Sequence, residues 1–308
     1  MKKQLVIATR GSMLALWQAE YIKSKIEEAH PHVSCSLNII KTTGDKILDV
    51  PLAKIGGKGL FVKEIEVALM NKEADLAVHS MKDVPMELPD GLELFACPKG
   101  AEPNDAFVSF KYESAESLPH GAKVGTSSLR RKLQLLEKRP DLEILDLRGN
   151  LQTRLKKLED GVYDAIILAE AGLRRLNLGH YIKQVLPVDF MLPASCQGIL
   201  GVETRSDDTE VTDYLLFLKH PETETRAQCE RAFLRKLQGG CQVPIACHSI
   251  FVDDDTLSVS GILYNLDGSV KIEKQMTGSA KEPVKLGCAL ADEVIKAGGD
   301  KILKEIYS

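Results

Sequence analysis

The stretch Lys123-Val124-Gly125-Thr126-Ser127-Ser128-Leu129-Arg130-Arg131 decides the fold, because it runs from a strand through a hydroxyl-rich turn into a helix. We predict a strand over 123–125 and a helix over 129–138. The alternation continues through a strand at 142–145, a helix at 151–159 and the apolar segment Ala165-Ile166-Ile167-Leu168. Strands that alternate with helices predict an α/β domain whose sheet is largely parallel.

The first hundred residues have a similar plan. Apolar periodicity predicts a strand at 3–8, a helix at 13–28, a strand at 33–40, a helix at 61–71 and a strand at 75–78. Residues 7–12 and 124–128 both lead from a strand through Thr and Ser into a helix, which is a weak sign of internal similarity. The sequence therefore predicts two α/β domains of similar plan.

The pattern changes after about residue 222. A charged helix at 223–237 is followed by strands at 245–252, 257–263 and 270–276, and then by helices that begin at Pro283 and Asp300. This order predicts a third, α+β domain, with Cys241 on the loop that leads into its sheet.

Composition narrows the class of protein. A chain of 308 residues is long enough for two or three domains of about 100 to 150 residues each. Its seven scattered cysteines argue against a disulfide framework and for a reducing cytosol. The apolar run at 5–8 is too short for a signal peptide, and no segment has the length of a membrane span. The net charge of −4 disfavours nucleic-acid binding.

The hexapeptide Gly239-Gly240-Cys241-Gln242-Val243-Pro244 presents one thiol in an exposed turn. The glycines permit positive φ and leave room beside the sulfur, and the proline ends the turn. A group could be attached at Cys241, or the thiol could attack a substrate, although an isolated cysteine is more often a buried hydrophobe. Zinc ligation with Cys247 and His248 is disfavoured, because this spacing lacks a second ligand cluster.

The motif His79-Ser80-Met81-Lys82-Asp83-Val84-Pro85 follows the predicted strand at 75–78. Open α/β sheets bind ligands at the carboxyl ends of their strands. Asp83 is therefore a candidate catalytic carboxylate, and Lys82 a candidate anion contact. A turn in which Asp83 caps a helix explains the same residues equally well.

Arginines recur at or just beyond the ends of predicted strands, or in the helix that follows. They are Arg10, Arg130, Arg131, Arg148, Arg154 and Arg175. Helix amino ends with guanidinium groups are natural sites for carboxylate or phosphate, so the pattern predicts a small anionic ligand. The alternative is an ordinary N-cap with solvated arginines.

The glycine-rich segment Lys54-Ile55-Gly56-Gly57-Lys58-Gly59-Leu60-Phe61 resembles a phosphate loop only superficially. It lacks the first glycine and the Ser or Thr after lysine, so a nucleotide site is disfavoured. The glycines instead predict a mobile loop over 43–59 that closes over a ligand, with simple linker flexibility as the alternative.

Taken together, these motifs resemble the porphobilinogen deaminase, or hydroxymethylbilane synthase, family. The resemblance rests on Gly-Gly-Cys-Gln-Val-Pro-Ile at 239–245, His-Ser-Met-Lys-Asp-Val-Pro at 79–85, Gly-Thr-Ser-Ser-Leu-Arg-Arg at 125–131, Leu-Arg-Gly-Asn at 147–150 and Gln197-Gly198 before a strand. The motifs occur in order along essentially the whole chain. One departure is Cys196, where the family usually has glycine before the Gln-Gly pair.

The resemblance implies a transferase that deaminates porphobilinogen and joins four molecules head to tail into a linear tetrapyrrole. It implies a dipyrromethane cofactor held by a thioether to Cys241, and no metal. The implied cofactor-binding residues are Ser80, Lys82, Asp83, Thr126, Ser128, Arg130, Arg131, Arg148 and Arg154. The implied substrate-binding residues are Arg10, Ser12, Phe61, Arg148, Arg154, Arg175 and Gln197, with Asp83 as the catalytic residue.

The resemblance also implies a three-domain α/β fold. The first two domains are expected to be like type II periplasmic binding proteins, with residues 1–98 plus 199–217 in domain 1 and 104–192 in domain 2. A smaller α+β domain at 220–308 carries Cys241. A monomeric cytoplasmic enzyme is expected, with no nucleic-acid or membrane partner. The rival hypotheses are a solute-binding module, which the missing signal peptide disfavours, and a cysteine hydrolase.

Overall fold

The computed structural model describes residues 3–46, 59, 61–239 and 243–307. The chain forms two compact units. One unit combines Met1–Ala101 with Ile199–Glu224, and the other combines Glu102–Gly198 with Thr225–Ser308. Each unit is thus built from two segments that are distant in the sequence.

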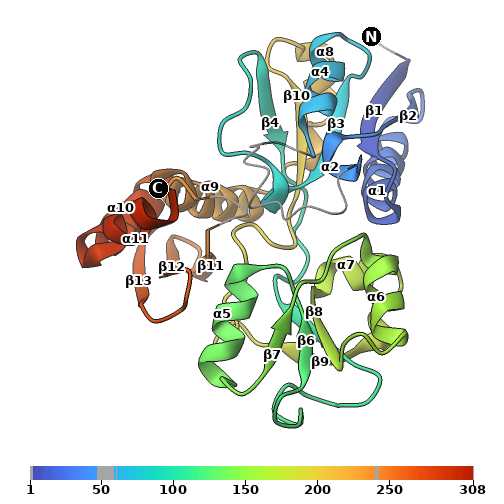
Figure 1. Cartoon of the computed structure of the whole chain (residues 1–308). Coiled ribbons are helices and arrows are strands. Elements are labelled where there is room, and N and C mark those ends of the chain that lie inside the picture. Colours follow the sequence, from blue (N-terminus) through green and yellow to red (C-terminus); the bar gives the residue numbers. More distant parts are fainter. Residues whose placement is uncertain (1–2, 47–58, 60, 240–242, 308) are drawn as a thin grey trace. The chain divides into compact units, whose positions relative to one another are not determined.

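The first unit contains a five-stranded sheet (Figure 1). Its strands are β1 (Gln4–Arg10), β2 (Ser34–Ile40), β3 (Leu76–Ser80), β4 (Leu92–Ala96) and β10 (Leu200–Arg205), in the order β2-β1-β3-β10-β4. β1 pairs in parallel with β2 and β3, whereas β10 runs antiparallel to β3 and β4. The carboxyl ends of β1 and β3 therefore lie at the same edge as the start of β10.

Helices cover both faces of this sheet. On one face, Leu5 and Ile7 of β1 pack with Ile22 of helix α1 (Met13–Ala29) and with Val211 of helix α8 (Thr209–Asp213). On the other face, Ala8 packs with residues of helix α4 (Lys63–Met70). Side chains alternate between the faces of a strand, so β1 contributes to both cores. The short helix α2 (Thr43–Lys46) follows β2.

The second unit contains another five-stranded sheet. Its strands are β5 (Asp105–Val108), β6 (Lys123–Gly125), β7 (Glu143–Leu145), β8 (Ala165–Ala169) and β9 (Ile182–Leu186), in the order β7-β6-β8-β5-β9. β6 is parallel to β7 and β8, and β5 is antiparallel to β8 and β9. The accompanying helices are α5 (Leu129–Lys138), α6 (Leu151–Glu159) and α7 (Glu170–Arg175). The pairing pattern repeats that of the first sheet.

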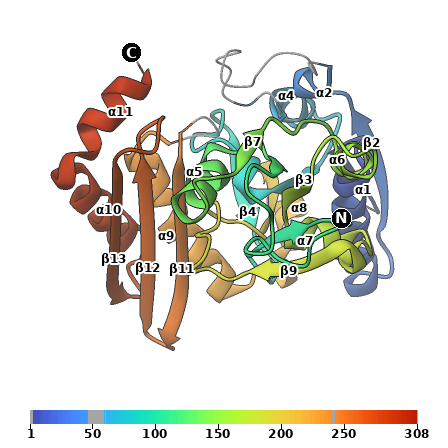
Figure 2. The same cartoon turned by 60° about the horizontal axis from the view of Figure 1, so that its bottom comes forward.

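The same unit holds a three-stranded antiparallel sheet of β11 (Ile245–Asp253), β12 (Thr256–Tyr264) and β13 (Lys271–Ser279), drawn as neighbours in Figure 2. Its core contains Phe233 of α9 (Pro221–Lys236) and Leu290 of α10 (Pro283–Val294). A Cβ atom at Gly261 of β12 would lie 2.6 Å from the Phe233 ring, so glycine allows this close approach. Helix α11 (Asp300–Tyr307) ends the chain, and Ile302 joins this core.

The predicted fold class is confirmed: two α/β parts share one strand order, and a smaller α+β part follows them. The helices at 129–138 and 151–159 have the predicted bounds. β4, β5 and β9 were missing from the predicted elements, because no helix follows them directly and the strand-to-helix alternation that identified equally short strands is lacking there. No helix within the described ranges is long and apolar enough to cross a membrane.

Candidate functional site

The first unit has a pocket where β1 and β3 end. Its polar lining residues are Arg10, Ser12, Gln18, His79, Ser80 and Asp83, and Phe61 contributes an aromatic ring. Ser12 also caps α1, accepting a hydrogen bond from the backbone N–H of Ala15 at 3.3 Å. The structure thus brings together most of the predicted residues of this unit.

Arg10 ends β1 and has two neighbours in the pocket region. Its Nε donates to both carboxylate oxygens of Asp45 at 3.2 Å, and its guanidinium carbon lies 4.2 Å from the centre of the Phe61 ring. Burial disfavours the Asp45 carboxylate, but hydrogen bonds from Arg10 and Thr42 hold its pKa below the ordinary value. Sequence reasoning missed Asp45. A predicted anion-binding arginine therefore already has a carboxylate partner in the protein.

Asp83 lies in the 3-10 turn η1 (Met81–Asp83), directly after β3, and its side chain is exposed at the pocket. Lys82 beside it is half-buried. Ser80, the last residue of β3, accepts a hydrogen bond from Nε2 of Gln18 at 2.9 Å. Gln18 is 3% exposed and was missed, although a polar residue on the apolar stripe of α1 was an available signal.

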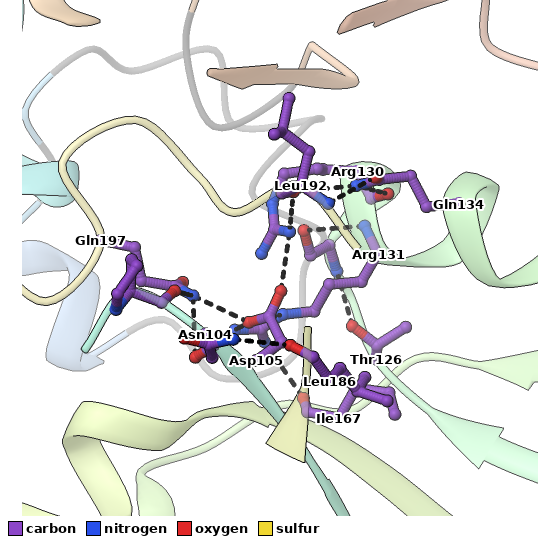
Figure 3. A network of polar contacts seen from close by, with 12 residues as sticks. Asn104, Asp105, Thr126, Arg130, Arg131, Gln134, Ile167, Leu186, Leu192 and Gln197 are labelled. Carbon is purple, nitrogen blue, oxygen red and sulfur yellow. Dashed lines mark hydrogen bonds and ion pairs between the residues drawn. The ribbon is translucent and has the colours of Figure 1, made fainter. Parts of the chain in front are cut away.

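In the second unit, Asp105 is the centre of a buried polar network (Figure 3). Arg130 donates from Nη1 to Oδ2 of Asp105 at 2.7 Å. Arg131 donates from Nε and Nη2 to Oδ1 at 3.0 and 2.7 Å. Each arginine also donates a hydrogen bond from Nη1 to a backbone oxygen. Arg130 donates to Leu192, and Arg131 donates to Ile167. The arginine pair is therefore fixed from two sides.

The charges of this network do not cancel. Asp105 is fully buried, and Arg130 and Arg131 are 5% and 7% exposed. Burial disfavours the carboxylate, but the two guanidinium groups outweigh it and hold the pKa of Asp105 well below its ordinary value. The three groups together carry one positive charge. Because a buried charge is costly without a counter-charge, this arrangement favours an anionic ligand.

The adjacent hydroxyl residues organise the start of α5. Ser128 is its N-cap and accepts a hydrogen bond from the backbone N–H of Arg131 at 3.5 Å. Thr126 accepts one from the backbone N–H of Ser128 at 3.2 Å. The N-cap alternative is thus correct for Ser128, but the two arginines are buried, not solvated.

Gln197 belongs to the same network. Its Nε2 donates to Oδ1 of Asp105 at 3.0 Å and to the backbone oxygen of Pro103 at 2.6 Å. The preceding residue, Cys196, has a φ of 59°, in the left-handed region that favours glycine. Its backbone N–H donates to Oε2 of the buried Glu230 at 2.6 Å, which helps to hold this conformation.

Three further predicted arginines lie after β7 and β8. Arg148 is half-buried in a turn that needs Gly149, whose φ is 107°. Arg154, in the first turns of α6, donates from Nε to the backbone oxygen of Gly149 at 2.8 Å. Arg175 on α7 donates from Nη2 to the backbone oxygen of Gly198 at 2.7 Å.

Some predicted features lie outside the described residues. Cys241 is among them, and so is most of the segment 43–59 that was predicted to be a mobile loop. The disfavoured zinc hypothesis paired Cys241 with Cys247. Cys247 is fully buried in β11, and this burial raises the pKa of its thiol well above the ordinary value. Across the described ranges, no group of three or more His, Cys, Asp or Glu side chains could hold a metal ion.

The sequence matches two family models that cover most of its length. Residues 5–213 match "Porphobilinogen deaminase, dipyromethane cofactor binding domain", and residues 224–296 match "Porphobilinogen deaminase, C-terminal domain". Among solved structures, the methionine binding protein MetQ is 15% identical with a TM-score of 0.46, over 74% of this chain and 95% of that one.

Relatives named porphobilinogen deaminase align along nearly the whole chain. The protein from Nitratidesulfovibrio vulgaris strain Hildenborough is 55% identical over 307 residues, which cover 99% of this chain and 98% of the relative. The protein from Trichlorobacter lovleyi is 50% identical over 305 residues, which cover 99% and 97%. With both family models and these full-length relatives in agreement, the chain belongs to the porphobilinogen deaminase family.

Proposed function

We propose that the chain is a hydroxymethylbilane synthase, which joins four porphobilinogen molecules head to tail and releases one ammonia for each. The observation that carries the proposal is the buried arginine pair at Asp105, with its unbalanced positive charge. Porphobilinogen bears an acetate and a propionate group, so each added ring brings two carboxylates. Guanidinium groups bind carboxylates through paired hydrogen bonds that fix both charge and orientation.

The same arginine pair fits the dipyrromethane cofactor of the family, which also carries carboxylates. We propose that it is bound through the Cys241 sulfur and that it supplies the pyrrole ring to which the first substrate molecule is joined. The residues proposed to hold it are Ser80, Lys82, Asp83, Thr126, Ser128, Arg130, Arg131, Arg148 and Arg154. Arg130 and Arg131 are suited to this role because Asp105 and backbone oxygens already fix their orientation.

The residues proposed to bind substrate are Arg10, Ser12, Phe61, Arg148, Arg154, Arg175 and Gln197. Arg10 pairs with Asp45 and lies against the Phe61 ring, so a substrate carboxylate would compete with Asp45 for the guanidinium. Asp83 is the proposed catalytic residue. Its exposed carboxylate would stabilise the positive charge that develops on the substrate ring as ammonia leaves, and would accept or donate protons there.

The decisive experiment is the mass of the intact, denatured protein, with peptide mapping and Cys241→Ser as the control. We expect an increment of two pyrrole units on Cys241 that the serine variant lacks, because serine forms no thioether. If the purified protein is unmodified, it is incubated with porphobilinogen and measured again. A chain that gains no mass even then would contradict the proposal and support a solute-binding module.

Arg148→Leu is expected to impair cofactor assembly or chain elongation without unfolding the protein. The side chain is half-buried after β7, in a turn whose shape depends on Gly149, so its loss removes a positive charge and leaves the turn intact. Steady-state kinetics and the mass of the purified variant measure the effect. Lys156→Leu is the control, since Lys156 pairs with Glu159 on the exposed side of α6. Normal KM and kcat in Arg148→Leu would count against a carboxylate contact.

We further propose three domains, with boundaries at 1–98 plus 199–217, 104–192 and 220–308. The return of β10 into the first sheet supports the two-segment first domain. We also propose that the protein is monomeric and cytoplasmic. Sedimentation of the purified protein tests whether it is a monomer.

A further inference from the structure

Three ionisable side chains, Glu66, Glu203 and His79, are buried behind the pocket of the first unit. Glu203 and His79 lie on the same face of the sheet, because His79 is paired with Gly201 and Glu203 with Ala77 in the antiparallel register. Nε2 of His79 lies 2.7 Å from Oε2 of Glu203. The His79 side chain is 5% exposed, and that of Glu203 is fully buried.

Glu66 approaches this pair from α4, the helix that covers the same face. It is 7% exposed. Burial raises the pKa of Glu66, the charge of Glu203 raises it further, and His79 opposes both. Oε1 of Glu66 and Oε1 of Glu203 are buried, and neither has a hydrogen-bond partner in the part of the chain that the structure describes. Two such carboxylates are costly to keep ionised together, which favours one retained proton.

The neighbouring charged groups already have partners or lie at the pocket. Arg205, two residues along β10, pairs with Asp75 and Asp208. Arg10 of β1 pairs with Asp45 of α2. Glu64, on the same helix as Glu66, accepts hydrogen bonds from Thr43. Lys82 and Asp83 follow β3 in η1.

The pocket provides a route to these buried groups. Its titratable lining side chains are Arg10, Asp83 and His79, and of these His79 contacts the buried carboxylate of Glu203. Ile65, which precedes Glu66, also lines the pocket. The imidazole of His79 therefore gives a path for a proton between Glu203 and the pocket, and Glu66 lies close enough for the charge of Glu203 to raise its pKa.

We propose that Glu66, Glu203 and His79 form a buried proton store for the reaction in this pocket, with the resting proton on Glu66. The proposal rests on the proposed function. When the C–N bond of a bound aminomethyl group breaks, its electron pair leaves with nitrogen, and the store supplies the one proton that lets the amine leave as ammonia. The pyrrole carbon that forms the new C–C bond then loses one proton. That proton refills the store, so each cycle balances.

The first test measures protonation directly in the full-length holoprotein, labelled with carbon-13 at the glutamate carboxyl carbons. We expect one carboxyl resonance to keep the chemical shift of the protonated form at neutral pH, and Glu66→Gln to lack that resonance. Glu20→Gln, which removes an exposed carboxyl from α1, should retain it. A wild-type protein whose glutamates are all ionised at neutral pH would overturn the proposal.

The second test separates a proton function from a structural one. Glu66→Gln keeps the shape of the side chain, so we expect an unchanged KM, a kcat lower by on the order of 10²-fold and a shifted basic limb of the kcat profile against pH. Glu20→Gln should match the wild type in all three. A normal kcat and pH profile in Glu66→Gln would exclude the proton store. The Cys241 adduct tests the reaction class independently, so failure of one proposal is distinguishable from failure of the other.

Discussion

Asp83→Ala is expected to keep the fold and to lose turnover by orders of magnitude. The carboxylate is exposed at the end of η1, so its removal leaves no cavity and breaks no core contact. A preorganised charge at a developing cation is typically worth about 3 to 4 kcal/mol of barrier, or on the order of 10²- to 10³-fold in kcat. Stopped-flow measurement of ammonia release, with thermal unfolding in parallel, gives both quantities.

The matched control for this variant is Asp90→Ala, which removes another exposed aspartate of the same unit. It should have wild-type kcat and wild-type stability. A near-normal rate for Asp83→Ala would remove Asp83 from the mechanism. A large loss of stability in Asp83→Ala would instead show that the residue is structural, as the helix-capping alternative holds.

The sequence predicted the strand-to-helix junctions well because their signals are local. Ser12, Ser128 and Asn150 are the N-caps of α1, α5 and α6, and each accepts a hydrogen bond from a backbone N–H three residues ahead. Such contacts involve neighbours in the chain, so residue order is sufficient to predict them. Because these signals come from neighbouring residues, the predicted helix bounds at 129–138 and 151–159 agree with those of the structure.

The partners of the arginines could not be predicted in this way. Asp105 is 25 residues from Arg130 in sequence, and the two meet only because β5 inserts antiparallel beside β8. No periodicity of the sequence specifies that pairing. Glu203 and His79 are 124 residues apart and meet because β10 returns to β3. Polar residues within otherwise apolar strands indicated that some charged side chains are buried. This pattern does not identify the residue with which each of them pairs.

Asp105→Asn is expected to destabilise the protein strongly. It leaves the guanidinium groups of Arg130 and Arg131 buried without their counter-charge, and removing one member of a buried ion pair typically costs about 3 to 5 kcal/mol. Urea unfolding of wild type and variant, monitored by circular dichroism, measures the difference in the free energy of unfolding. The variant should also hold a carboxylate ligand less specifically, since the arginine pair loses its common anchor.

The difference in the free energy of unfolding between wild type and Asp105→Asn should depend on pH, and this dependence identifies its cause. The pKa of Asp105 is lower in the folded protein than in the unfolded chain, where it is about 3.9. The stabilisation is therefore fully present above the unfolded value and is lost progressively as pH falls from that value through the lower folded pKa. The difference in stability between wild type and Asp105→Asn should thus narrow steadily in acid. Asp141→Asn, which removes the partner of Arg139 in a partly exposed pair, should cost far less. Equal losses in the two variants, or a gap that does not narrow as the pH falls, would contradict an electrostatic role for Asp105.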